Sequence, residues 1–140
     1  MLVILVVLGV IPFALGGFMN WLMMTHSNPL IPFELFGIVT LLIWATIAFF
    51  IKPYIKNIMN VVIGLNSVAF VVLILLGIQE LLLQAYWLNF VGSWTQYYYL
   101  PLLIIGLTLT SWSHSVFSGY CAAFLLMVIV TVLGCKLRKK

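Results

Sequence analysis

Long apolar runs separated by short polar breaks dominate the chain. Four such runs lie at about 1–24, 33–51, 58–78 and 116–135. Each is close to the roughly 20 apolar residues that a helix needs to cross a membrane. The pattern therefore predicts an all-α protein, a polytopic transmembrane helical bundle of four spans, with a single transmembrane domain over 1–140.

The breaks between the runs carry residues that stop or bend helices. Pro29 and Pro32 stand in the polar segment before the second run, and Pro53 follows that run. Proline has no backbone N–H to continue a helix, so these positions predict helix ends. Pro12 falls inside the first run and predicts a kink there.

The segment 81–114 has a different pattern from the four runs. It is amphipathic and rich in aromatic residues, which prefer the membrane–water interface. We expect it to lie on the outer membrane surface or to dip into the membrane as a re-entrant segment before the last span. Two alternatives stay open: a fifth, short crossing over 97–112, and a helical arm packed against the last span. The aromatic residues are Tyr86, Trp87, Phe90, Trp94, Tyr97, Tyr98 and Tyr99.

Composition excludes most soluble classes of protein. Hydrophobic residues make up 66% of the 140 positions and charged residues only 6%, whereas a soluble domain has about 25% charged residues. A soluble enzyme, a nucleic-acid-binding domain and a disordered tail are all excluded. The lipid bilayer is therefore the expected partner, and no nucleic acid is.

The basic residues predict the orientation. Lys52 and Lys56 follow the second run, and the other four Lys/Arg residues lie within 136–140. Basic residues in short loops stay cytoplasmic, so four spans place both termini in the cytoplasm. We interpret these cations as membrane flanks that form no binding stripe. The use of Ile, Leu, Asn and Lys suggests the plasma membrane of a bacterium.

Three polar residues are candidates for a substrate or ion pathway. Glu34 and Glu80 are expected near the outer face, where together they could hold a cation or an amine; alternatively, each is a solvated residue at a helix boundary. Asn66 is an amide within the third span, where it could line a cavity or bond a neighbouring backbone. Ionisable groups deep in a bilayer usually mark function, and neither glutamate is expected at mid-depth.

Two histidines are weak candidates for metal or haem ligands. His26 and His114 both lie in short polar turns expected on the outer side, where a histidine is tolerated without a ligand. Serines flank His114, but no G-x-S-x-G motif accompanies them and the chain has no Asp. We therefore expect no cofactor, no metal and no catalytic residue.

Small and polar residues recur at helical spacing in two of the spans. Such spacing lets helices approach closely and bond across their contact. We expect these positions to serve helix packing, within the bundle or with a partner. They are Asn60, Gly64 and Ser67 in the third span, and Ser115, Gly119 and Ala123 in the last.

Two functional hypotheses follow from this inventory. The first is a non-catalytic subunit or accessory protein of a larger membrane complex, associating with other membrane subunits. The second is a small transporter or channel that works by self-association as a homo-oligomer, with an outer-facing acidic and amide site. The sequence leaves enzymatic activity uncertain and disfavoured.

Overall fold

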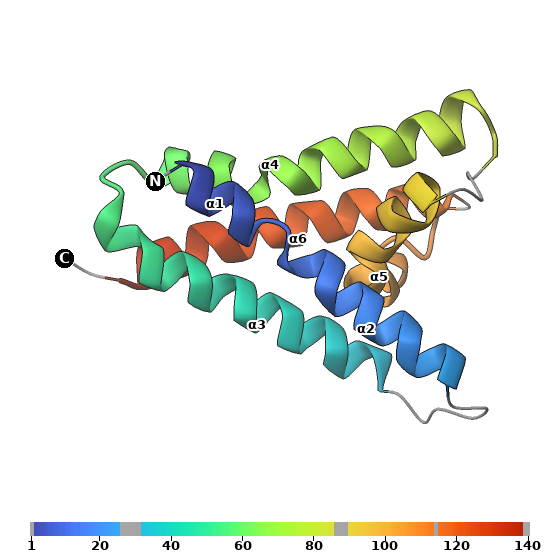
Figure 1. Cartoon of the computed structure of the whole chain (residues 1–140), viewed down its shortest axis with the longest axis horizontal. Coiled ribbons are helices and arrows are strands. Elements are labelled where there is room, and N and C mark those ends of the chain that lie inside the picture. The colour runs from blue at the N-terminus through green and yellow to red at the C-terminus, as the bar shows by residue number, and fades with distance from the viewer. Residues whose placement is uncertain (1, 26–31, 86–89, 114, 139–140) are drawn as a thin grey trace.

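The computed structural model describes residues 2–25, 32–85, 90–113 and 115–138, and its elements are all helical. Figure 1 shows the long helices of the chain side by side, with the helix at 90–109 seen nearly end-on near one end of them. In chain order the elements are α1 (Leu2–Leu8), α2 (Ile11–Thr25), α3 (Phe33–Ile51), the 3-10 turn η1 (Lys52–Tyr54), α4 (Ile58–Gly77), the π-helical turn η2 (Ile78–Leu82), α5 (Phe90–Leu109) and α6 (Val116–Leu137).

Four segments of the described chain are long and apolar enough to cross a membrane. They are Val3–Thr25, Phe33–Tyr54, Ile58–Leu82 and Val116–Leu137. The expected helical class and the presence of four candidate spans are therefore confirmed. The third segment extends to Leu82 because the chain beyond Gly77 continues as a π-helical turn instead of ending.

The first span is interrupted just before Pro12. The Gly9 N–H donates to the Leu5 carbonyl at 2.8 Å, whereas the Phe13 N–H donates only three residues back, to the Val10 carbonyl at 3.0 Å. Pro12 lies in the first turn of α2, where its missing N–H would have had no helical partner. The break therefore precedes the proline, and α2 then runs on through Gly16 and Gly17.

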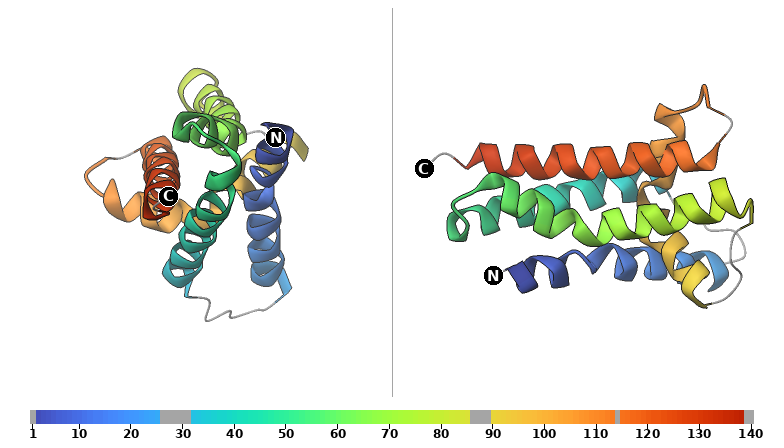
Figure 2. Two further views of the ribbon diagram at one scale, coloured as in Figure 1. Left: turned by 90° about the vertical axis from the view of Figure 1, so that its left-hand side faces the viewer. Right: turned by 90° about the horizontal axis from the view of Figure 1, so that it is seen from above.

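Helix α5 crosses the other helices instead of running along them. Figure 2 shows it transverse to the long axes of α3, α4 and α6. This helix belongs to the segment 81–114, which the sequence predicts at the outer membrane surface. In the structure its middle is deeply buried, with Tyr98 and Tyr99 0% exposed and Leu102 1% exposed. It contacts α2, α3, α4 and α6, and its Tyr98, Tyr99 and Leu102 belong to the hydrophobic core.

The bundle has two unlike ends. The crossed end is the one near α5, where α2 and η2 end and where α3 and α6 begin (Figure 1). The basic end is the opposite one, where the η1 turn meets the end of α6. Helix α1 also begins toward the basic end.

Candidate functional site

Helix α5 fits between the spans because glycines let the backbones approach. At Gly16 of α2, an added Cβ would overlap the carbonyl group of Tyr97. Pro101 lies four residues after Tyr97 inside α5, and a proline cannot donate the helical hydrogen bond to that carbonyl. The carbonyl faces the Gly16 backbone, an arrangement suited to a weak Cα–H···O contact.

Two more glycine contacts hold the second half of α5. A Cβ on Gly37 of α3 would lie 2.9 Å from the Pro101 carbonyl oxygen. A Cβ on Gly106 would overlap the carbonyl of Gly119 in α6, and one on Gly119 would press on Leu107. Three spans therefore each present a glycine to the transverse helix.

Two tyrosines bond α5 to carbonyls of other helices. Tyr98 Oη donates to the Gly9 carbonyl at 2.9 Å, and Tyr99 Oη donates to the Ala69 carbonyl at 2.7 Å. The Gly9 carbonyl is available because the break before Pro12 leaves it without the N–H four residues on. Both phenols are thereby satisfied inside the core, as buried hydroxyls require.

The π-helical turn η2 directs two polar side chains to different helices. Gln79 is fully buried and its Nε2 donates to Thr95 Oγ1 in α5 at 3.1 Å. Glu80 Oε1 accepts a hydrogen bond from Ser115 Oγ, the N-cap residue of α6, at 2.6 Å. A carboxylate beside a helix N-terminus is stabilised by the helix dipole. Glu80 therefore has a structural role at the start of α6.

Asn66 lies in a polar cross-link within the core. Its Oδ1 accepts from Trp44 Nε1 of α3 at 3.2 Å, and its Nδ2 donates to Thr131 Oγ1 of α6 at 3.1 Å. The same Nδ2 donates to the Val62 carbonyl within α4 at 2.9 Å. The amide thus joins three spans and is 3% exposed.

Glu34 lies apart from both Glu80 and Asn66. It is exposed in the first turn of α3 and borders two shallow grooves, about 470 and 300 Å³ in volume, against the end of α5. The start of α3 and the end of α4 stand at opposite edges of the crossed end (Figures 1 and 2). The structure does not bring the two glutamates together.

The packing candidates have unequal surroundings. A Cβ on Gly64 would press on the Leu5 side chain of α1, and Ala123 is 0% exposed. Ser67 bonds the Gly64 carbonyl within its own helix, whereas Asn60 is exposed. With the contacts of Gly119 and Ser115 above, most of these residues face other helices of the same chain.

The histidine candidates cannot be placed. His26 and His114 lie outside the described residues. Within the described ranges, no three His, Cys, Asp or Glu side chains gather in a way that could hold a metal ion.

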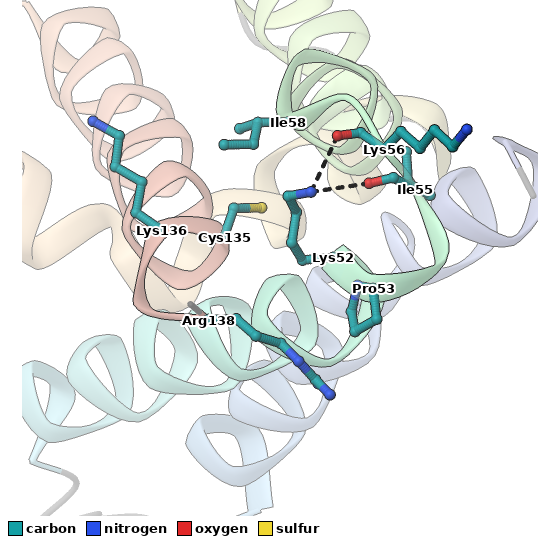
Figure 3. Close-up of a pocket in the computed structure, with 8 residues that line it drawn as sticks. All are labelled: Lys52, Pro53, Ile55, Lys56, Ile58, Cys135, Lys136 and Arg138. Atoms are coloured by element: carbon teal, nitrogen blue, oxygen red, sulfur yellow. Dashed lines mark hydrogen bonds between the residues drawn. The ribbon is translucent and has the colours of Figure 1, made fainter. Parts of the chain in front are cut away.

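The basic end contains a cavity that sequence reasoning did not indicate. It has a volume of about 980 Å³ and lies between the η1 turn and the end of α6. Figure 3 shows the Lys52 ammonium between the two segments, with the other cationic side chains extending from the rim. The only available signal was that the turn and the C-terminal helix are both basic. The lining residues are Lys52, Pro53, Ile55, Lys56, Ile58, Cys135, Lys136 and Arg138.

Two of these cations are held by backbone oxygens. Lys52 Nζ donates to the Ile55 and Lys56 carbonyls at 3.2 and 3.1 Å. Arg138 lies over the Phe49 ring, 5.1 Å from its centroid, and its Nη1 is 3.4 Å from the Phe49 carbonyl oxygen. The tertiary structure brings the basic turn and the basic end of α6 to the border of one cavity, a proximity that their separation in the sequence does not show.

Comparison with known proteins identifies no relative of this chain. The chain matches no protein family, no curated protein and no solved structure.

Proposed function

We propose that the protein is a non-catalytic subunit or accessory protein of a larger membrane complex. In this proposal it resides in the plasma membrane of a bacterium, with the basic end and both termini in the cytoplasm. The observation that carries the proposal is the position of α5, whose Tyr98 and Tyr99 are fully buried between the spans. A core filled in this way leaves the outer surface for interactions.

The polar groups of the core support the same proposal. Asn66, Gln79 and both tyrosines bond atoms of neighbouring helices. Buried polar groups that are bonded within a bundle fix the packing of its helices. A rigid, internally bonded bundle suits a protein that presents a fixed surface to a partner.

The first test is native mass spectrometry of the protein extracted gently from its host membrane. We expect a discrete assembly that contains a second polypeptide. A stable homo-oligomer without another polypeptide would contradict the accessory role.

Photo-crosslinking can then locate the contact surface. A photoreactive residue is placed in turn at Trp21, Leu42, Phe70 and Leu125, one outward-facing position on each span, exposed by 54, 61, 52 and 58%. A control position, Leu65, is 0% exposed. We expect one face to give a discrete adduct with another protein while Leu65 gives none. Adducts with the same chain at every position would contradict the proposal.

A second candidate function rests on Glu34. Its exposed carboxylate beside two grooves could contribute to a pathway between protomers of a homo-oligomeric transporter or channel. Reconstituted protein would then conduct or transport a cation, and Glu34→Gln would abolish the flux without changing the oligomer. Absence of flux from a folded oligomer would remove this candidate.

A further inference from the structure

The cations of the basic end have no side-chain carboxylate to neutralise them. Glu34 and Glu80 are the two acidic residues of the sequence, and both lie toward the crossed end, on α3 and η2. Four of the six Lys and Arg residues line the cavity beside η1. The cavity is therefore a region of concentrated positive charge.

We propose that this cavity binds the phosphate group of an acidic phospholipid. The side chain of Lys52 extends from the η1 turn into the region beside Cys135 of α6 (Figure 3), and an ammonium has three N–H groups. In the described part of the chain, two of these donate to the Ile55 and Lys56 carbonyls. The third is available for a phosphate oxygen, and the same two bonds hold the ammonium in place.

The rim of the cavity can complete the binding of an anion. Lys56, Lys136 and Arg138 all extend from the lining, and each is exposed. Their long, flexible side chains can turn toward a bound phosphate, which Arg can contact with two parallel N–H groups. The volume of about 980 Å³ lies within the range of about 300–1,000 Å³ typical of small-ligand sites.

The surroundings favour a lipid over a soluble anion. Ile55, Ile58 and Pro53 form an apolar part of the lining. The helices that border the cavity also carry exposed apolar side chains near it in sequence, Phe50 in α3 and Met59 in α4. These can contact acyl chains while the head group occupies the cavity. Basic pockets between membrane spans on the cytoplasmic side are known to bind anionic head groups.

A local site makes a different prediction from general surface charge. General attraction to an anionic membrane contributes about 1 kcal/mol per Lys or Arg, or about fivefold in affinity, wherever the residue lies near the surface. A site instead concentrates the loss at the cations that line the cavity, which are Lys52, Lys56, Lys136 and Arg138. This inference does not depend on the proposed accessory role, because either kind of membrane protein could hold a structural lipid.

The experiment is a lipid titration of the delipidated full chain in detergent, followed by native mass spectrometry. The probes are phosphatidylglycerol, phosphatidylcholine with the same acyl chains, and soluble glycerol phosphate. The test variant is K52Q/R138Q. The matched control is K139Q/K140Q, which removes the same number of positive charges from the two residues that follow Arg138 in the sequence. A K52R variant tests whether a cation alone suffices.

We expect one phosphatidylglycerol to bind at least about tenfold more tightly than phosphatidylcholine. K52Q/R138Q should abolish this preference while K139Q/K140Q and K52R largely retain it. Thermal unfolding of each lipid-free variant verifies that it is folded. If K52Q/R138Q does not fold, K56Q/K136Q replaces it as the test variant, because it changes only exposed residues at the rim of the cavity. An equal loss of the preference for phosphatidylglycerol in the test variant and the control variant would contradict a local binding site. Equal binding of glycerol phosphate would overturn its assignment to a lipid.

Discussion

The two ends of the bundle differ in the surroundings of their polar and charged side chains. At the crossed end, Tyr98, Tyr99, Gln79 and Glu80 all bond atoms of neighbouring helices. At the basic end, Lys56 and Lys136 are exposed around a cavity that no acidic side chain shares. This difference supports the proposal that the basic end binds a lipid, whereas the hydrogen bonds of the crossed end hold helices of the same chain together.

The strongest test of this division is Gly16→Ala at the crossed end. The added Cβ would overlap the Tyr97 carbonyl, so a backbone must shift. We expect a loss of about 1–3 kcal/mol in the free energy of unfolding, as in overpacked cores. Reversible unfolding in mixed micelles measures it.

The adjacent glycine provides a matched control. A Cβ on Gly17 would have no neighbouring atom within 4 Å, and alanine favours helix over glycine by up to about 1 kcal/mol. Gly17→Ala should therefore be neutral or stabilising. Equal destabilisation by both substitutions would mean that α5 does not pack against α2 in this way.

The next largest effect is expected from Asn66→Leu, in the core between the two ends. It removes the partners of Trp44 Nε1 and Thr131 Oγ1. Hydrogen bonds between membrane helices contribute about 0.6 kcal/mol on average and up to about 1.7, so we expect a loss of about 1–2 kcal/mol.

Asn60→Leu is the control for that substitution, because Asn60 is exposed on the same helix. It should change the stability by less than about 0.5 kcal/mol. If Asn66→Leu proved as harmless as Asn60→Leu, the hydrogen bonds of Asn66 would not stabilise the packing of the three helices that they join.

A smaller effect is expected from Tyr99→Phe. The substitution keeps the ring and removes only the bond to the Ala69 carbonyl, which costs about 1 kcal/mol. Tyr54→Phe, on a ring 73% exposed at the basic end, should cost nothing measurable. A larger loss from Tyr54→Phe would reverse the proposed division between the ends.

The smallest effect on stability is expected at the basic end itself. Lys56→Gln should change the free energy of unfolding in lipid-free micelles by less than about 0.5 kcal/mol, because the Lys56 side chain is exposed. Added phosphatidylglycerol should raise the free energy of unfolding of this variant less than that of the unsubstituted protein, because a ligand stabilises the folded state in proportion to how well it binds. An equal gain would separate Lys56 from the site.

The sequence was sufficient for the parts of the fold that depend on local pattern. The four apolar runs each appear as a helix or a broken helix, because length and hydropathy decide whether a segment can span a membrane. The position of α5 could not be obtained in this way. Its aromatic residues suit a membrane surface equally well, and only the glycines at 16, 37 and 119 in other spans make room for it.

The candidate sites were predicted less well than the spans. Spacing along one helix found Gly64 and Gly119, since helical periodicity is a local property. In the structure α6 packs closely against both α3 and α4, and these two helices contact each other little. Glu34 and Glu80 therefore stand at opposite edges of the bundle, which spacing along one helix cannot show. Nor could it show that a turn and a C-terminal helix share a cavity, which depends on long-range topology.

The transverse position of α5 also constrains how the protein is made. Gly16 and Gly37 come before α5 in the chain, but Gly119 follows it. The set of glycines that α5 packs against is therefore incomplete until α6 has been synthesised. A chain that ended before α6 would contain Gly16 and Gly37 but would lack the contact of Gly119 with Gly106 and Leu107. Such a chain would leave uncovered the side of α5 that packs against α6.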